Sequence, residues 1–271
     1  MFNNKNFIAI FAHPDDEVIF ASSVIEKASK IIICFSSSPN NKKVSIGRKI
    51  VKNDYPLKNI KFLGIKEFNR DSRYQEFFEW NNPKESEYGL LLKNQKINHE
   101  YIKNYYFLIK VLEPYVVNVD FILTHNPWGE YGHPEHVQLH RVVHHLAKKL
   151  NKDILVPGIF SEKSKNLMLK TSYRLNNKPF LMKTNKLLWE KLKTLYIKNN
   201  CWTWNINDQP IDYDCFYKLK DYDFKESNFK KYKSDIPLIF IDKPFILDKR
   251  LKPIIYLYYY ASRLIKSLLK F

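Results

Sequence analysis

The first 160 residues alternate between two spacings of apolar positions. Short runs rich in β-branched and aromatic side chains predict buried strands, and the intervals between them repeat apolar residues every three or four positions, which predicts helices. The predicted strands are 6–12, 30–38, 59–65, 117–127 (with its exit loop) and 153–160, and the predicted helices are 17–30, 44–55, 99–115 and 133–150. This alternation predicts an α/β fold with a parallel sheet and right-handed crossovers.

The rest of the chain follows this pattern less closely. Residues 66–98 are polar and aromatic, and we expect them to form an excursion from the sheet. Residues 161–271 are irregular, apart from a helical stretch near 185–197 and a basic, aromatic tail helix at 250–271. We therefore expect a core over 1–160 and, within the same domain, a C-terminal part over 161–271.

The chain is strongly basic, because 45 lysines and arginines outnumber 28 aspartates and glutamates, for a formal charge of +17. This excess suits nucleic acid, an anionic membrane surface or a phosphorylated substrate, and it also fits a coding bias toward A and T. No recognised nucleic-acid motif is present, so we expect no nucleic-acid partner. The three cysteines have no repeated spacing, which argues against a disulfide framework or a cysteine-type zinc site and favours a reducing compartment.

The stretch AHPDDE at 12–17 places a histidine and three carboxylates directly after the first predicted strand. In an open parallel sheet, ligands bind at the carboxyl ends of the strands. One interpretation is an acidic cap, because Asp16 and Glu17 would lie at a helix N-terminus, where negative charge is favoured. A cap does not require His13, however, and imidazole nitrogen with carboxylate oxygen is a ligand set for a divalent metal such as zinc.

A second stretch, GEYGHPEH at 129–136, repeats this arrangement after the fourth predicted strand. Two of the six glycines, Gly129 and Gly132, lie in this loop, which indicates unusual backbone geometry. His133 and His136 are three residues apart across the first turn of the next helix, so both can face one cavity. The two motifs offer six candidate groups whose roles the spacing does not assign: His13, Asp15, Asp16, His133, Glu135 and His136.

With AHPDDE at 12–17 and GHPEH at 132–136, the chain resembles the PIG-L/LmbE-like family of zinc-dependent de-N-acetylases. The resemblance covers the strand order through about residue 160 and implies a Rossmann-like three-layer fold with a mainly parallel sheet. It implies an enzyme that removes an N-acetyl or N-acyl group from an amino sugar or sugar conjugate. The implied cofactor is one zinc ion per chain, with other divalent metals also compatible.

The family's site residues match positions of this sequence. The resemblance implies that His13, Asp16 and His136 bind the metal. It implies that Asp15 is the general base that takes a proton from the attacking water, and that His133 stabilises the oxyanion. The second motif is usually HPDH in the family, and its acidic residue is not a metal ligand, so glutamate in this position leaves the implied ligand set unchanged.

The resemblance is less specific about the substrate. An arginine after the second strand often contacts the sugar, which makes Arg48 the candidate, although the acidic residue that often follows three positions later is Val51 here. The loop around Trp128 and Tyr131, together with CWTW at 201–204, resembles family members found with bacterial surface-polysaccharide synthesis. We therefore expect an N-acetylated amino sugar, nucleotide- or lipid-linked, with aromatic rings that stack on it or pack in the core.

The tail at 250–271 combines basic flanks with aromatic and aliphatic positions. Such a segment suits a helix at a membrane interface, or a helix packed on the core with its lysines in water. The chain shows no secretory leader and no apolar run of about 18 residues. We therefore expect a cytoplasmic protein, peripheral on the inner face of the membrane if the tail lies there.

Two other functions compete with deacetylation. A carbohydrate-binding protein without catalysis predicts a broken set of metal ligands, whereas every matched position is present here. A metal-dependent phosphoesterase more often uses two metals, whereas this chain offers one compact set of ligands.

Overall fold

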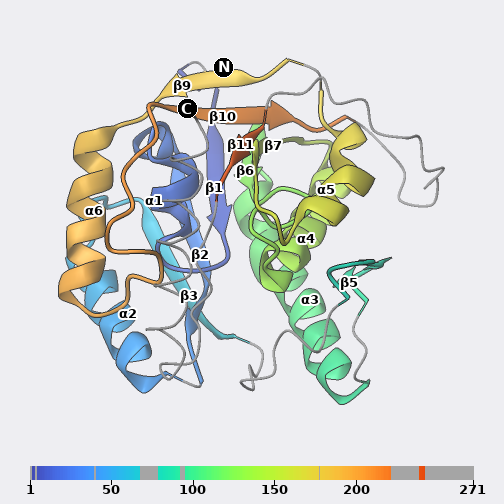
Figure 1. The fold of residues 1–271 in the computed structure, drawn as a ribbon, viewed down its shortest axis with the longest axis horizontal. Coiled ribbons are helices and arrows are strands. Elements are labelled where there is room, and N and C mark those ends of the chain that lie inside the picture. The colour runs from blue at the N-terminus through green and yellow to red at the C-terminus, as the bar shows by residue number, and fades with distance from the viewer. Residues whose placement is uncertain are drawn as a thin grey trace, which may run out of the picture.

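The computed structural model describes residues 2–3, 5–39, 41–67, 79–91, 95–176, 178–220 and 238–241. Within them, a seven-stranded sheet runs through the molecule in the order β3-β2-β1-β6-β7-β10-β9 (Figure 1). The strands in that order are Ile60–Lys66, Lys30–Ser37, Phe7–Phe11, Phe121–Thr124, Asp153–Pro157, Tyr213–Lys218 and Phe180–Lys183. The first five are parallel, and β10 is antiparallel to both β7 and β9. The predicted α/β fold with a mainly parallel sheet is confirmed.

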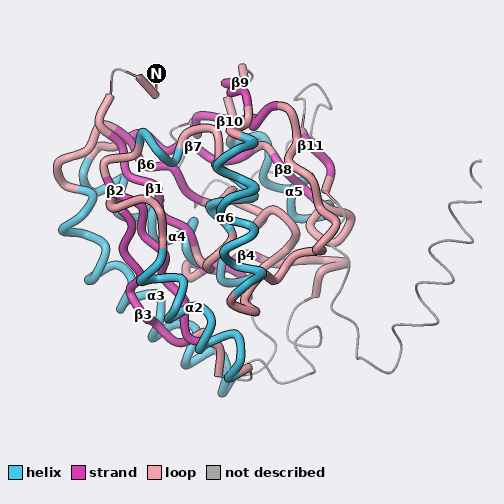
Figure 2. Tube along the Cα trace, turned by 90° about the vertical axis from the view of Figure 1, so that its left-hand side faces the viewer, coloured by secondary structure: helices cyan, strands magenta, loops and turns pink. Residues whose placement is uncertain are grey.

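Helices cover both faces of the sheet and make the fold three-layered (Figures 1 and 2). One face carries α1, α2 and α6, and the other carries α3, α4 and α5. Their bounds are Asp16–Ala21, Lys42–Asp54 and Lys186–Lys198 on the first face, and Gln95–Val116, Pro134–Leu150 and Lys165–Thr171 on the second.

The side chains of β1 point alternately to the two faces of the sheet, which explains why helices cover both faces. Phe7, Ala9 and Phe11 pack toward α1, α2 and α6, whereas Ile8 and Ile10 pack toward α3 and α4. All five side chains are buried, as expected for a parallel strand that has no solvent-exposed face. The fully buried central strands fix the positions of the loops that follow them.

Two helices differ from the sequence prediction. The predicted helix 17–30 ends as α1 at Ala21, because the N–H of Ser23 donates to the Asp214 carboxylate (2.9 Å), and a short 3₁₀ turn follows at Ile25–Lys27. The predicted helix 99–115 is longer in the structure, since α3 begins at Gln95 and ends at Val116. Pro114 lies in its last turn, where a proline removes only one hydrogen bond of the helix and is tolerated.

The segments outside the main sheet form small additions. In the excursion, β4 (Glu85–Ser86) and β5 (Gly89–Leu90) make an antiparallel hairpin, and β8 (Ile159–Phe160) pairs in parallel with β11 (Ile239–Phe240). In the described part of the chain, no helix is long and apolar enough to cross a bilayer. The predicted tail helix at 250–271 lies outside the described residues.

Candidate metal centre

Two loops at the carboxyl ends of neighbouring parallel strands build the site. β1 leads into 12–15 and then α1, and β6 leads into 125–133 and then α4. The backbone of Asp15 is left-handed (φ 92°), as are those of Gly129 (67°) and Gly132 (78°). A Cβ on Gly129 would lie 2.7 Å from the carbonyl oxygen of His133. This close approach of the backbone, together with the positive φ angles, explains why the loop contains glycine and confirms its unusual backbone geometry.

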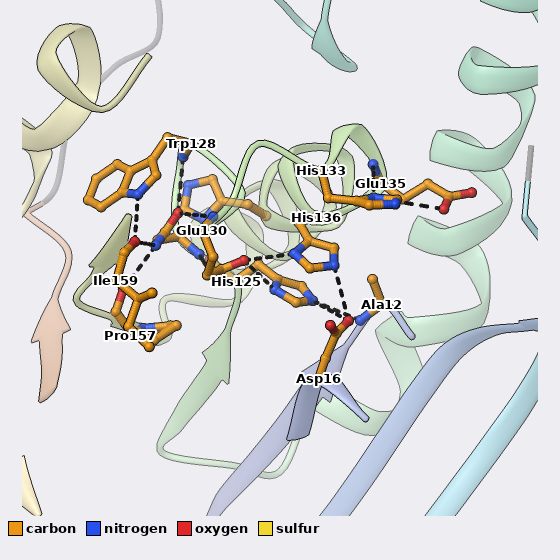
Figure 3. A network of polar contacts seen from close by, with 12 residues as sticks. Ala12, Asp16, His125, Trp128, Glu130, His133, Glu135, His136, Pro157 and Ile159 are labelled. Atoms are coloured by element: carbon orange, nitrogen blue, oxygen red, sulfur yellow. Dashed lines mark hydrogen bonds and ion pairs between the residues drawn. The ribbon is translucent and has the colours of Figure 1, made fainter. Parts of the chain in front are cut away.

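Three side-chain atoms, from the first loop and from the first turns of α1 and α4, form a compact triangle. His13 Nδ1 lies 3.2 Å from His136 Nε2 and 3.3 Å from Asp16 Oδ2. His136 Nε2 lies 3.1 Å from the same Asp16 oxygen, and Figure 3 shows this contact between His136 and Asp16. A tetrahedral zinc ion with bonds of about 2.0–2.1 Å separates its ligand atoms by about 3.3 Å. The triangle therefore has the dimensions of three ligands to one zinc ion.

The second oxygen of Asp16 strengthens this fit. Asp16 Oδ1 is buried and has no hydrogen-bond partner among the described residues. Leaving a buried carboxylate oxygen without a partner is costly, and a cation at the centre would compensate it. The donor set of two imidazoles and one carboxylate is also one that catalytic zinc sites use.

Each histidine of the triangle is held by a carboxylate at its other ring nitrogen. His13 Nε2 lies 2.7 Å from Glu135 Oε2, and His136 Nδ1 lies 2.8 Å from Glu130 Oε2. Glu130 also accepts the backbone N–H of Asn126 (2.7 Å), which fixes its own carboxylate (Figure 3). Such outer carboxylates orient a ligating imidazole and set which nitrogen faces the metal.

Two further histidines lie beside the triangle, but their ring nitrogens form hydrogen bonds with other groups. His125 Nε2 accepts the backbone N–H of Ala12 (2.8 Å), so its proton is on Nδ1 and faces Glu130 (2.8 Å). His133 Nδ1 accepts the backbone N–H of Glu135 (3.2 Å), which places its proton on Nε2. Neither histidine offers a metal a free lone pair without giving up its present contact.

The electrostatics of the triangle favour a positive charge at its centre. Burial disfavours the charged form of His13, but Asp16 and Glu135 outweigh it and raise the pKa of His13 to about 9. Burial likewise works against ionised Asp16, yet His136 and His13 hold its pKa well below the usual value. A divalent cation would supply the same positive charge without a proton.

The remaining predicted polar groups lie beside the triangle. Asp15 Oδ2 accepts hydrogen bonds from the backbone N–H (2.7 Å) and the hydroxyl (2.8 Å) of Thr203. The ring of His133 lies 4.5 Å from that of His13 and 4.7 Å from that of His136. Glu17, read from the sequence as one of two acidic cap residues, lies in the first turn of α1 and accepts hydrogen bonds from Tyr196 (2.7 Å) and the Asp15 N–H (3.0 Å).

The predicted substrate-binding residues have different surroundings. Arg48 is buried on α2 with Nη1 2.6 Å from Glu67 Oε1, an oxygen that lies 4.0 Å from His13 Nε2. Tyr131 is half-buried, and its ring lies 5.0 Å from that of His136. Trp128 is fully buried and donates its indole N–H to the Ile159 carbonyl (2.7 Å), which corresponds to packing in the core, one of the two roles expected for the aromatic rings.

Sequence reasoning missed three participants, namely His125, Glu130 and Thr203. His125 directly precedes the stretch NPWG at 126–129, and Glu130 directly follows it. The position of Glu130 between Gly129 and Gly132 is the local feature that could have indicated its role. Thr203 lies 188 positions from Asp15, and the stretch CWTW that contains it indicated only an aromatic segment.

The chain is similar in sequence to known proteins. The sequence model of the family described as "PIG-L: GlcNAc-PI de-N-acetylase" matches residues 8–147, which include both loops. Uncharacterized protein L374 of Acanthamoeba polyphaga mimivirus is 27% identical over 206 residues, 71% of this chain and 80% of that protein.

Two solved structures share the fold. A deacetylase–teicoplanin complex from teicoplanin biosynthesis is 10% identical, with a TM-score of 0.50, and the match covers 80% of this chain and all of that chain. The zinc-inhibited form of teicoplanin deacetylase Orf2 is also 10% identical, with a TM-score of 0.52, and the match covers 81% of this chain and 99% of that one. At this identity the likeness establishes the fold alone.

Proposed function

Because the chain belongs to the PIG-L family of GlcNAc-PI de-N-acetylases, we propose that it is a zinc-dependent hydrolase that removes an N-acetyl or N-acyl group from an amino sugar or sugar conjugate. The observation that carries the proposal is the triangle of His13 Nδ1, an Asp16 oxygen and His136 Nε2, with separations of 3.1–3.3 Å. Three protein ligands at the carboxyl ends of parallel strands are the arrangement of a catalytic rather than a closed structural metal site.

In this proposal, His13, Asp16 and His136 hold one zinc ion, and other divalent metals are compatible with the same donors. A zinc ion held there would polarise the amide carbonyl and lower the pKa of water. Glu135 and Glu130 keep the two imidazoles turned toward the metal.

Asp15 acts as the general base. Its Oδ2 is fixed by two hydrogen bonds from Thr203, so the carboxylate keeps one orientation as it takes a proton from the attacking water. His133 carries its proton on Nε2, since Nδ1 accepts the Glu135 N–H, and it can donate that proton toward the developing oxyanion. The oxygen of the water bonds to the carbonyl carbon, and the C–N bond then breaks as the amine takes up the proton that Asp15 accepted. The products are the amine and the acid, which is acetate for an acetyl group.

The substrate and the cellular setting belong to the same proposal. Arg48 and Tyr131 are the candidate sugar contacts, and a nucleotide- or lipid-linked amino sugar of cell-surface glycan synthesis is the proposed substrate class. We place the enzyme in the cytoplasm, with peripheral membrane contact through 250–271. The basic and aromatic composition of that segment supports the contact.

Acetate release tests the proposed activity. The full-length protein is incubated with N-acetylglucosamine and its glycosides, before and after chelation, and with zinc added back. We expect acetate release that chelation abolishes and zinc restores. Sugar binding without acetate release would instead support the carbohydrate-binding alternative, and release of phosphate from sugar phosphates would support the phosphoesterase.

A further inference from the structure

Glu17 is a buried carboxylate that the proposed reaction does not use. It lies in the first turn of α1, directly after the proposed metal ligand Asp16, and its exposed fraction is 0%. A carboxylate removed from water needs hydrogen-bond donors for its oxygens. The two oxygens of Glu17 find these donors on different parts of the molecule.

Two tyrosines hold one oxygen of Glu17. Oε1 accepts hydrogen bonds from the hydroxyl groups of Tyr55 (2.9 Å) and Tyr196 (2.7 Å). Tyr55 directly follows α2, Tyr196 lies on α6, and both side chains are buried. The packing of α2 and α6 beside α1 therefore fixes the position of the Glu17 carboxylate.

The other oxygen of Glu17 holds the backbone of the proposed general base. Oε2 accepts the N–H of Asp15 (3.0 Å). Asp15 directly precedes α1, and its backbone is left-handed, with a φ of 92°. A left-handed backbone is unfavourable for a residue with a Cβ, so it persists only where surrounding contacts stabilise it. The hydrogen bond to Glu17 is such a contact.

The left-handed backbone of Asp15 affects where its carboxylate lies. An aspartate that precedes a helix normally has an extended backbone, and its carboxylate accepts an N–H of the first turn. In α1, which is described throughout, Asp15 caps no backbone N–H with its side chain. Its carboxylate instead accepts the N–H and the hydroxyl of Thr203. Glu17 thus holds the backbone of Asp15, and Thr203 holds its side chain.

We propose that Glu17 is a positioning residue: by holding the left-handed backbone of Asp15, it keeps the carboxylate of the base beside the metal centre and away from the first turn of α1. The proposal rests on the proposed function, in which Asp15 takes a proton from the attacking water. Because Glu17 is fully buried, its loss should lower kcat and leave KM and the zinc content unchanged.

Glu17→Met and Glu17→Gln test this role. Methionine has a similar length but cannot accept the Asp15 N–H, so kcat for N-acetylglucosamine should fall about ten-fold or more. Glutamine keeps an oxygen for the Asp15 N–H and can donate its two amide hydrogens to the tyrosine hydroxyl oxygens. Glu17→Gln should therefore retain most of the wild-type kcat.

Glu85→Met is the control for a general loss of stability. It removes a glutamate of the β4–β5 hairpin that accepts hydrogen bonds from Arg174, and it should keep the wild-type kcat. A wild-type kcat in Glu17→Met would overturn the proposal. So would a loss in Glu17→Gln or in Glu85→Met as large as the loss in Glu17→Met.

An exchange experiment separates the positioning role from the proposed reaction. Hydrogen exchange of the Asp15 amide, measured by NMR on zinc-loaded protein with isotope-labelled aspartate, reports on the hydrogen bond to Glu17. Exchange should be roughly ten-fold faster, or more, in Glu17→Met than in the wild type and Glu17→Gln. This result is expected even if N-acetylglucosamine is not hydrolysed and the proposed function fails. Equal exchange rates in the wild type and Glu17→Met would overturn the positioning role.

Discussion

The carboxylate of Glu135 lies 2.7 Å from Nε2 of His13, on the side of the imidazole opposite the nitrogen that faces His136 and Asp16. His13 lies in the loop after β1, and Glu135 lies in the first turn of α4, which follows β6, so this contact joins the two halves of the site.

Glu135→Gln should weaken metal binding without removing a proposed ligand. The amide keeps the shape of the side chain but loses the negative charge that orients and polarises His13, and such outer-shell changes typically cost about 10–100-fold in metal affinity. Competition with a chelator measures the zinc affinity. Glu162→Gln, on an exposed glutamate, serves as the control. Equal affinities in the two variants would contradict the role given to Glu135.

Thr203→Val should lower catalysis while leaving metal content intact. The valine keeps the backbone N–H bond to Asp15 but removes the hydroxyl bond of 2.8 Å. A hydrogen bond to a charged group contributes about 1.5 kcal/mol or more, so kcat should fall roughly ten-fold. Thr203→Ser keeps the hydroxyl and should retain most of the activity. Unchanged kcat in the valine variant would show that this bond does not orient the base.

Gly129→Ala should destabilise the protein and perturb the centre. The added Cβ would lie 2.7 Å from the His133 carbonyl oxygen, at a backbone φ of 67°. Gly64→Ala is the matched control, because Gly64 has a φ of 75° but nothing within 4 Å of the added atom. Backbone strain alone costs about 1–2 kcal/mol, so urea unfolding should show a larger loss for Gly129→Ala. Equal decreases in the free energy of unfolding of both variants would mean that the loop shifts and relieves the clash, which would contradict this prediction.

Glu85 should make folding stability depend on pH. Burial disfavours its ionised form, but the guanidinium groups of Arg141 and Arg174 outweigh this and hold the pKa of Glu85 below its usual 4.5. Because the folded-state pKa is depressed, the carboxylate stabilises the fold above pH 4.5 and loses that contribution as the pH falls through the folded-state value.

Glu85→Gln should therefore reduce the free energy of unfolding at pH 7 by about 3 kcal/mol, since it removes the negative charge that faces two buried guanidinium groups. Urea unfolding at pH 7 and in more acidic buffers measures the difference from wild type, which should shrink as the pH falls. A difference that stays constant with pH would contradict the ionised role of Glu85.

The sequence predicted the parts of the site that are local in the chain. AHPDDE and GHPEH each follow a strand, and parallel pairing of β1 with β6 brings their ends together, so the convergence of His13 and His136 followed from topology. The same alternation of strands and helices predicted the five parallel strands of the sheet.

Contacts between distant segments were not predictable in the same way. The orientation of Asp15 depends on Thr203, and the antiparallel strands β9 and β10 pair through residues whose pattern had indicated no regular sheet. The burial of Trp128 depends on an indole bond to the Ile159 carbonyl, which no spacing in the sequence reveals.

The zinc content of purified variants tests the central claim most directly. With elemental analysis after zinc loading and desalting, we expect one zinc ion per chain in the wild type, in Asp15→Asn and in the exposed control His145→Ala, and a loss of zinc in His136→Ala. Full zinc retention in His136→Ala, or loss of zinc in Asp15→Asn with His136 intact, would contradict the assignment of His13, Asp16 and His136 as the ligands.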